Sequence, residues 1–140
     1  VAAHVPKEYI ASDRLRIETY RRLVTCATRE DLLQLQKDLE DTFGPIPKEV
    51  TQLLDVAEIR VYALRFGLLS ITLRPPDVIF TVEKMVQAQP IFRDVQGTVR
   101  MPDERTLHWR PPQTYLETQT LIPLLRRMLS NAAVPLETNA

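Results

Sequence analysis

The sequence predicts an α+β fold: an N-terminal three-helix segment, a small antiparallel sheet and a C-terminal helix. Apolar residues recur at spacings of three and four over residues 12–66 and again near the C-terminus, which is typical of amphipathic helices. The stretch between them holds short β-rich runs divided by turn residues. We expect a single domain with a lead-in (1–11), a helical part (12–66), a β part (67–110), a closing helix (113–131) and a polar tail (132–140).

The first helix is predicted after Ser12 or Asp13, because either side chain can accept hydrogen bonds from the free N–H groups of a first turn. Its apolar residues fall on one face: Ile17, Tyr20, Leu23, Val24 and Ala27.

The second helix is expected to start at Thr28, with Asp31 completing a weaker form of the capping box. Its buried stripe comprises Leu32, Leu35, Leu39 and Phe43. Gly44 follows in the usual position of a helix stop, and Pro45 blocks continuation.

Pro47 is placed as the first residue of a third helix, where a missing N–H is no loss, and Gly67 is expected to end that helix. The connections between the three helices are short, which favours antiparallel neighbours. The third buried stripe comprises Val50, Leu53, Leu54, Ala57, Val61 and Leu64.

Four β-rich runs are predicted in the β part, over residues 69–73, 78–82, 95–101 and 106–109. Residues 74–77 read as a turn, and residues 102–105 connect the last two runs. Residues 84–89 form either one helical turn or an irregular link.

Composition limits the possible functions. With 140 residues, 44% of them hydrophobic, the chain has the profile of a soluble globular domain. No apolar run approaches the roughly 20 residues that a membrane span needs. The single cysteine, Cys26, cannot form an internal disulfide and fits a reducing cytosol. The chain begins with neither methionine nor a signal peptide, so we expect a piece of a longer protein.

Few residues suggest catalysis, and we expect no enzyme activity, no metal site and no cofactor in this domain. Neither His4 nor His108 has a metal-ligand spacing, and isolated glycines form no phosphate loop. A small hydrolase that uses Cys26 with His108 stays open as a rival, although no local motif supports it.

A nucleic-acid-binding module is the main alternative, using Arg100, Arg105, Trp109 and Arg110. Eighteen basic and eighteen acidic residues cancel, however, and a domain that depends on phosphate contacts normally carries a basic excess. A tryptophan that packs in the sheet is the more ordinary interpretation of Trp109.

The acidic end of the second helix is the most unusual feature. Asp38 and Asp41 lie on one helical side, and Glu40 extends the negative surface. A helix C-terminus carries partial negative charge, so acids there are mildly unfavourable. This placement indicates a partner, although an ordinary solvated face is the simpler interpretation.

Several motifs occur in order: Pro6-x-x-Tyr9-Ile10, Arg14 with Tyr20 and Leu23, Leu39-x-Asp41-x-Phe43-Gly44-x-x-Pro47, and Leu53-Leu54-Asp55-x-Ala57-x-x-Arg60. Together they resemble the C-terminal domain of bacterial transcription-repair coupling factors, the Mfd family. The likeness is dense over residues 5–67 and thinner beyond.

The resemblance implies a non-catalytic, autoinhibitory domain in the bacterial cytoplasm. In that family an ATP-driven, Mg-dependent DNA translocase displaces stalled RNA polymerase and recruits UvrA. The C-terminal domain packs on a UvrB-like N-terminal module, masks the UvrA-binding surface and restrains the motor.

The resemblance also implies which residues contact the UvrB-like module. Asp38 and Asp41 take the acidic positions, beside Glu40, whereas Thr42 replaces the usual arginine. The structural corner comprises Phe43, Gly44 and Pro47.

Overall fold

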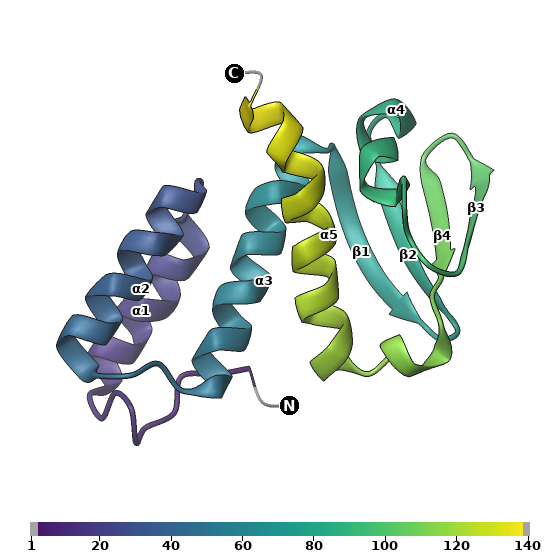
Figure 1. The fold of residues 1–140 in the computed structure, drawn as a ribbon. Helices are drawn as coiled ribbons and strands as arrows, with labels where there is room; N and C mark the ends of the chain where they lie inside the picture. Colours follow the sequence, from purple (N-terminus) through teal and green to yellow (C-terminus); the bar gives the residue numbers. More distant parts are fainter. Residues whose placement is uncertain (1–2, 139–140) are drawn as a thin grey trace. The chain divides into compact units, whose positions relative to one another are not determined.

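The computed structural model describes residues 3–138, with side chains to residue 133. The chain divides into two compact units, Val1–Val61 and Tyr62–Ala140, and the boundary falls within the third helix. The predicted α+β class is confirmed, with helices in the first unit and a sheet followed by a long helix in the second (Figure 1).

The first unit contains α1 (Asp13–Thr25), α2 (Arg29–Phe43) and most of α3 (Lys48–Arg65). The predicted caps are present: the Ser12 side chain accepts from the Leu15 N–H, and Thr28 and Asp31 form a complete capping box. Pro47 lies one residue before α3 rather than in its first position, and its carbonyl accepts from the Thr51 N–H.

The core of the first unit is formed mainly by α2 and α3. The predicted stripe of α2 is largely buried, with Leu35 only 1% exposed. The α3 stripe was wrong at Leu64, which is 72% exposed near the end of the helix. The predicted stripe of α1 was wrong in part, since only Leu23 is buried while Ile17 and Val24 are exposed. The buried residues of this cluster are Val5, Ile10, Leu23, Cys26, Leu32, Leu35, Leu39, Val50, Ala57 and Val61.

The C-terminus of α2 is held by a side chain from the lead-in. The Tyr9 hydroxyl lies 3.2 Å from the Leu39 carbonyl oxygen and 2.9 Å from that of Gly44. Its ring also packs against Phe43, with ring centroids 5.7 Å apart. Burial, and then the charge of Glu40, raises the pKa of Tyr9, so the phenol stays a neutral donor.

The C-terminus of α1 is held from α3. The Arg60 guanidinium donates to the carbonyl oxygens of Leu23, Val24 and Cys26 at 2.7, 2.5 and 3.0 Å. These carbonyls have no partner within α1, because the last turn of a helix leaves its acceptors free. Arg60 therefore ties α3 to α1 by satisfying backbone groups that would otherwise depend on water.

The second unit is built on a four-stranded antiparallel sheet in the order β1-β2-β4-β3. Its strands are β1 (Leu68–Arg74), β2 (Asp77–Val82), β3 (Thr98–Asp103) and β4 (Thr106–Arg110). Pro75 and Pro76 alone join β1 to β2, as the turn prediction required. Between β2 and β3 lie a short helix, α4 (Met85–Ala88), and a 3₁₀ turn, η1 (Gln89–Phe92).

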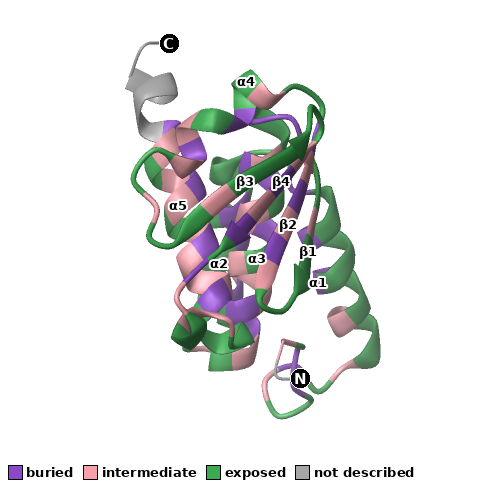
Figure 2. Ribbon diagram, turned by 90° about the vertical axis from the view of Figure 1, so that its right-hand side faces the viewer, coloured by how far each residue is buried: buried purple, intermediate pink, exposed green. Residues whose placement is uncertain are grey.

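One face of this sheet is covered by α5 (Thr118–Thr138), and no helix in the described part of the unit covers the other face (Figure 2). Buried and half-buried residues alternate along β2, as expected for a sheet with one core face. Along α5, the buried residues Leu121, Leu125 and Leu129 recur every fourth position and so share one side of the helix.

Three predicted boundaries were wrong. The closing helix does not span 113–131: residues 113–115 form a separate 3₁₀ turn, η2 (Gln113–Tyr115), and α5 starts at Thr118. The expected tail from residue 132 is helical as far as Thr138, and residues 139–140 lie outside the described part. The third strand starts at Thr98 rather than residue 95, because the segment before it turns at Gly97.

Replacing Arg60 with methionine tests the α3–α1 tie. The variant keeps an apolar stem but loses three charged hydrogen bonds, so we expect the free energy of unfolding to fall by about 1–3 kcal/mol. Urea unfolding followed by circular dichroism measures this change. Arg21, which is exposed on α1, provides the control Arg21→Met; equal losses in both variants would contradict the role of Arg60.

Candidate partner-binding surface

The candidate site is the acidic end of α2, defined here as Asp38, Glu40, Asp41 and Thr42. The last turn of α2 contains no basic residue to offset the partial negative charge of the helix terminus. Glu40, Asp41 and Thr42 are exposed, whereas Asp38 is half-buried. The structure therefore separates Asp38 from its three neighbours.

Asp38 is engaged inside the first unit. One carboxylate oxygen lies 2.6 Å from the Arg22 Nη2 on α1, and the other lies 2.8 Å from the Gln34 Nε2 one turn back on α2. These hydrogen bonds, that from Arg22 first, lower the pKa of Asp38. Asp38 thus links α1 to α2, so much of its hydrogen-bonding capacity is already used.

Asp41 is the acid with unused capacity. Glu40 accepts a long hydrogen bond of 3.3 Å from Gln36, whereas Asp41 has no hydrogen bond or ion pair among the described residues. Asp41 and Thr42 are adjacent on the exposed surface next to the corner. A carboxylate in this position is available to an external donor.

The corner that follows holds the acidic end in place. Gly44 has a φ of 91°, a conformation that side chains with a β-carbon rarely adopt. A β-carbon there would meet nothing within 4 Å, so the backbone conformation alone requires glycine. Phe43 is half-buried against the core cluster, and Pro47 precedes α3.

Sequence reasoning missed Arg22 as the partner of Asp38. The two residues lie sixteen positions apart on different helices, so no local spacing indicates the contact. The only sequence signal for such a contact was the unfavourable negative charge at the end of α2. The Arg22 guanidinium compensates this charge at Asp38, whereas no described cation pairs with Asp41.

The residues of the nucleic-acid alternative are mostly engaged elsewhere. Trp109 is 1% exposed and its indole N–H donates to the Gln96 carbonyl oxygen at 2.8 Å, so it offers no face on which a base can stack. Arg110 is paired with Asp77 at 2.8 Å, a contact that lowers the pKa of Asp77. Arg100 lies 3.2 Å from the His108 Nδ1. Arg105 is exposed.

The hydrolase rival gains no support. Cys26 is buried, and burial together with the charge of Asp31 raises the pKa of its thiol, the reverse of what a nucleophile needs. His108 belongs to the second unit and lies 3.7 Å from Asp77. Among the side chains that the structure describes, residues 3–133, no three His, Cys, Asp or Glu are grouped as metal ligands. No described helix is long and apolar enough to span a membrane.

Comparison with known proteins identifies the family. The model of the TRCF domain matches residues 1–91 of the 140. The chain belongs to the TRCF domain family. The transcription-repair-coupling factor of Staphylococcus aureus strain USA300 is 39% identical over 66 residues, and that of Staphylococcus epidermidis strain ATCC 35984 is 43% identical over 65.

These matches cover 47% and 46% of the chain but only 6% of each relative. The TRCF domain thus corresponds to a small part of a much longer protein in these species. A solved structure, the crystal structure of the C-terminal domain of a transcription-repair coupling factor, has the same fold, with a TM-score of 0.72. Sequence identity to it is 21%, and the match covers 94% of this chain and 89% of that one.

The ion pair of Asp38 predicts a pH dependence of stability in this TRCF domain. Because the folded pKa of Asp38 is lowered, its ionised form stabilises the fold above its unfolded pKa of about 3.9. This contribution is lost as the pH falls through the lowered folded pKa. The difference in urea midpoint between wild type and Asp38→Asn should be constant from neutral pH to about pH 5 and shrink below about pH 4. A difference that does not change with pH would contradict the ion pair.

Proposed function

We propose that this TRCF domain is a non-catalytic autoinhibitory domain of a transcription-repair coupling factor. It packs on the UvrB-like N-terminal module of the same protein and masks the surface that binds UvrA. It also restrains the DNA translocase until that enzyme engages stalled RNA polymerase. The ATP and Mg²⁺ that drive translocation bind other domains, and the whole protein works in the bacterial cytoplasm.

Asp41 carries this proposal. It is exposed, has no partner among the described residues, and lies at a helix terminus that disfavours negative charge. A basic side chain on the UvrB-like module would relieve this repulsion on contact. Asp38 contributes indirectly, because its hydrogen bond with Arg22 fixes the end of α2 against α1 and so positions Asp41.

A weak contact is sufficient for such a lock. The domain and the module are joined in one chain, so tethering supplies a high effective concentration. A shift of a few kcal/mol, supplied when other domains bind DNA and polymerase, then opens the closed state. Rim ion pairs of this kind determine orientation and specificity more than affinity. Thr42, in place of the usual arginine, removes one charged contact, so the closed state is less stable or uses different partner residues.

Charge reversal at Asp41 tests the proposal in the full-length protein. Asp41→Lys should raise UvrA binding in the absence of polymerase by about fivefold or more, because it opposes basic side chains on the module and favours the open state. Surface plasmon resonance with immobilised UvrA measures the change.

Glu104→Lys provides the matched control, since Glu104 is also an exposed acid but lies in the turn between β3 and β4. The control should bind UvrA as the wild type does. If Asp41→Lys stays folded by circular dichroism and binds UvrA no better than the control, Asp41 has no part in the lock.

A further inference from the structure

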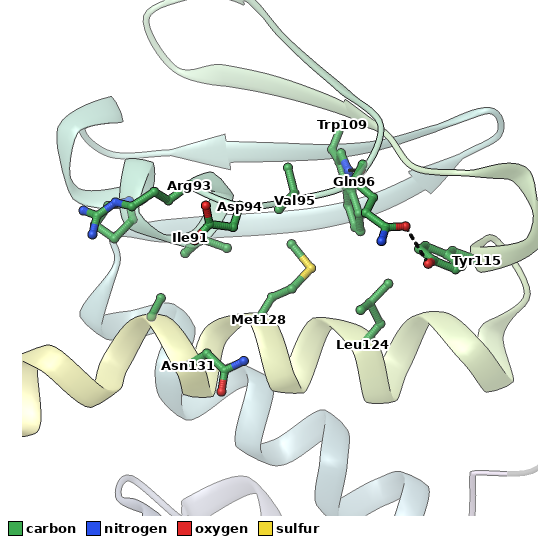
Figure 3. A pocket seen from close by; sticks show the side chains of 12 residues that line it. Ile91, Arg93, Asp94, Val95, Gln96, Trp109, Tyr115, Leu124, Met128 and Asn131 are labelled. Atoms are coloured by element: carbon green, nitrogen blue, oxygen red, sulfur yellow. Dashed lines mark hydrogen bonds between the residues drawn. The ribbon is translucent and has the colours of Figure 1, made fainter.

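The second unit contains a cavity of about 530 Å³ between α5 and residues 93–96, here called the slot (Figure 3). Its volume falls within the range of about 300–1,000 Å³ typical of ligand sites. The lining residues that the structure describes lie between Pro90 and Ala132, all within the second unit.

The middle of the slot is apolar. Leu124 and Met128, one turn apart on α5, project toward residues 93–96, while Trp109 lies on the sheet side (Figure 3). Both α5 residues are only half-buried, although the neighbouring α5 residues Leu125 and Leu129 are buried. Methionine adapts its shape to varied apolar surfaces, which suits a site for side chains of different shape.

The loop that forms the other wall is fixed in advance. The Trp109 indole N–H holds the Gln96 carbonyl, and the Tyr115 hydroxyl lies 2.8 Å from the Gln96 Oε1 (Figure 3). Gly97 has a φ of 93°, and a β-carbon there would lie 2.1 Å from the Arg110 carbonyl oxygen. The loop is thus held close to β4, so the slot needs little reorganisation to accept a ligand.

The charged side chains that line the slot, Arg93 and Asp94, give it no net charge. Arg93 and Asp94 are adjacent, exposed and opposite in charge, and neither has a partner among the described residues. Asn131 is exposed on α5 and is likewise without a partner there, and the Gln96 carboxamide closes one end. Each carboxamide offers both donor and acceptor groups, as a peptide unit does. A polyanion such as nucleic acid finds no net positive charge at this rim.

We propose that the slot binds an extended segment of a partner protein. Two bulky apolar side chains on one side of the segment enter the space between Trp109, Leu124 and Met128. The main chain of the segment pairs with the Asn131 carboxamide, and an opposite pair of flanking charges meets Arg93 and Asp94. The slot lies almost entirely beyond residues 1–91, the part matched by the TRCF family model, and on the other unit from Asp41. This interaction is therefore separate from the proposed lock.

Trp109 is the single tryptophan of the chain, so its fluorescence reports directly on the slot. The probe is a pool of end-capped neutral pentapeptides with Leu, Phe or Met at the second and fourth positions, which share one side of an extended chain. The control pool has serine at both positions. We expect the apolar pool to shift or quench Trp109 emission to saturation and the serine pool to leave it unchanged. The absence of any saturable change with the apolar pool overturns the proposal.

Variants separate a peptide from other occupants. Met128→Glu should weaken peptide binding by at least about tenfold, because binding would bury a charge. Asn131→Leu, at an exposed position that the fold does not need, should weaken peptide binding by roughly three- to tenfold. The same variant should leave binding of the uncharged dye N-phenyl-1-naphthylamine unchanged. Val86→Glu, at a 69% exposed apolar residue of α4 outside the slot, should bind both probes as the wild type does.

If Asn131→Leu weakens the binding of dye and peptide equally, or changes the binding of neither, the slot does not recognise a peptide main chain. It is then a simple apolar cavity, and the proposal is overturned. The proposal would also be overturned if the wild-type chain forms a dimer in size-exclusion chromatography and Met128→Glu abolishes that dimer. A second copy of the chain would then occupy the slot. Thermal unfolding of each variant shows whether a loss of binding reflects a loss of folding.

Discussion

The three hydrogen bonds from Arg60 to the end of α1 are the constraint on which the first unit depends. They place a cation at a helix C-terminus, where it is favoured by the partial charges of the last carbonyls. They also bring α3 to α1 across the chain, although α1 buries few apolar residues of its own. Tyr9 holds the end of α2 in the same way with a neutral hydroxyl. Both residues stand in the motifs that resemble the Mfd family, which gives those motifs a structural reason.

These two contacts explain why the acidic end of α2 can be acidic. A helix terminus that lacks a basic last turn is normally weak, but here the single Tyr9 O–H is shared between two backbone carbonyls, and Arg22 pairs with Asp38. The uncompensated negative charge on Asp41 then destabilises the helix terminus only slightly. Asp41 itself has no hydrogen bond or ion pair among the described residues, so it adds no such contact within the first unit.

Most helix limits of the fold could be predicted from residues close together in the sequence. The contacts between distant residues that hold the helices together could not. Ser12, the Thr28–Asp31 capping box and Gly44 act within a few residues, so the helix limits followed from sequence spacing. The Arg22–Asp38 pair and the reach of Arg60 join positions far apart in the chain, and no periodicity reveals them. The start of α5 was predicted too early because Tyr115 falls at a helical spacing from the later apolar residues, although residues 113–115 form only a 3₁₀ turn.

The apolar stripe of α5 shows why a sequence pattern alone cannot separate packing from binding. Leu121, Leu125 and Leu129 form one row that is fully used in the core. Leu124 and Met128 form a second row, one position away, that faces the slot and is only partly covered. Both rows lie on one broad apolar face of α5 and satisfy the same helical periodicity, so spacing alone does not tell which row is buried. The structure divides that face because Gln96 and Gly97 hold the opposing loop against β4, where it leaves the second row open. The position of this loop opposite α5 therefore depends on a glycine and on a hydrogen bond from the Trp109 side chain to the Gln96 backbone, rather than only on the size of the apolar residues around it.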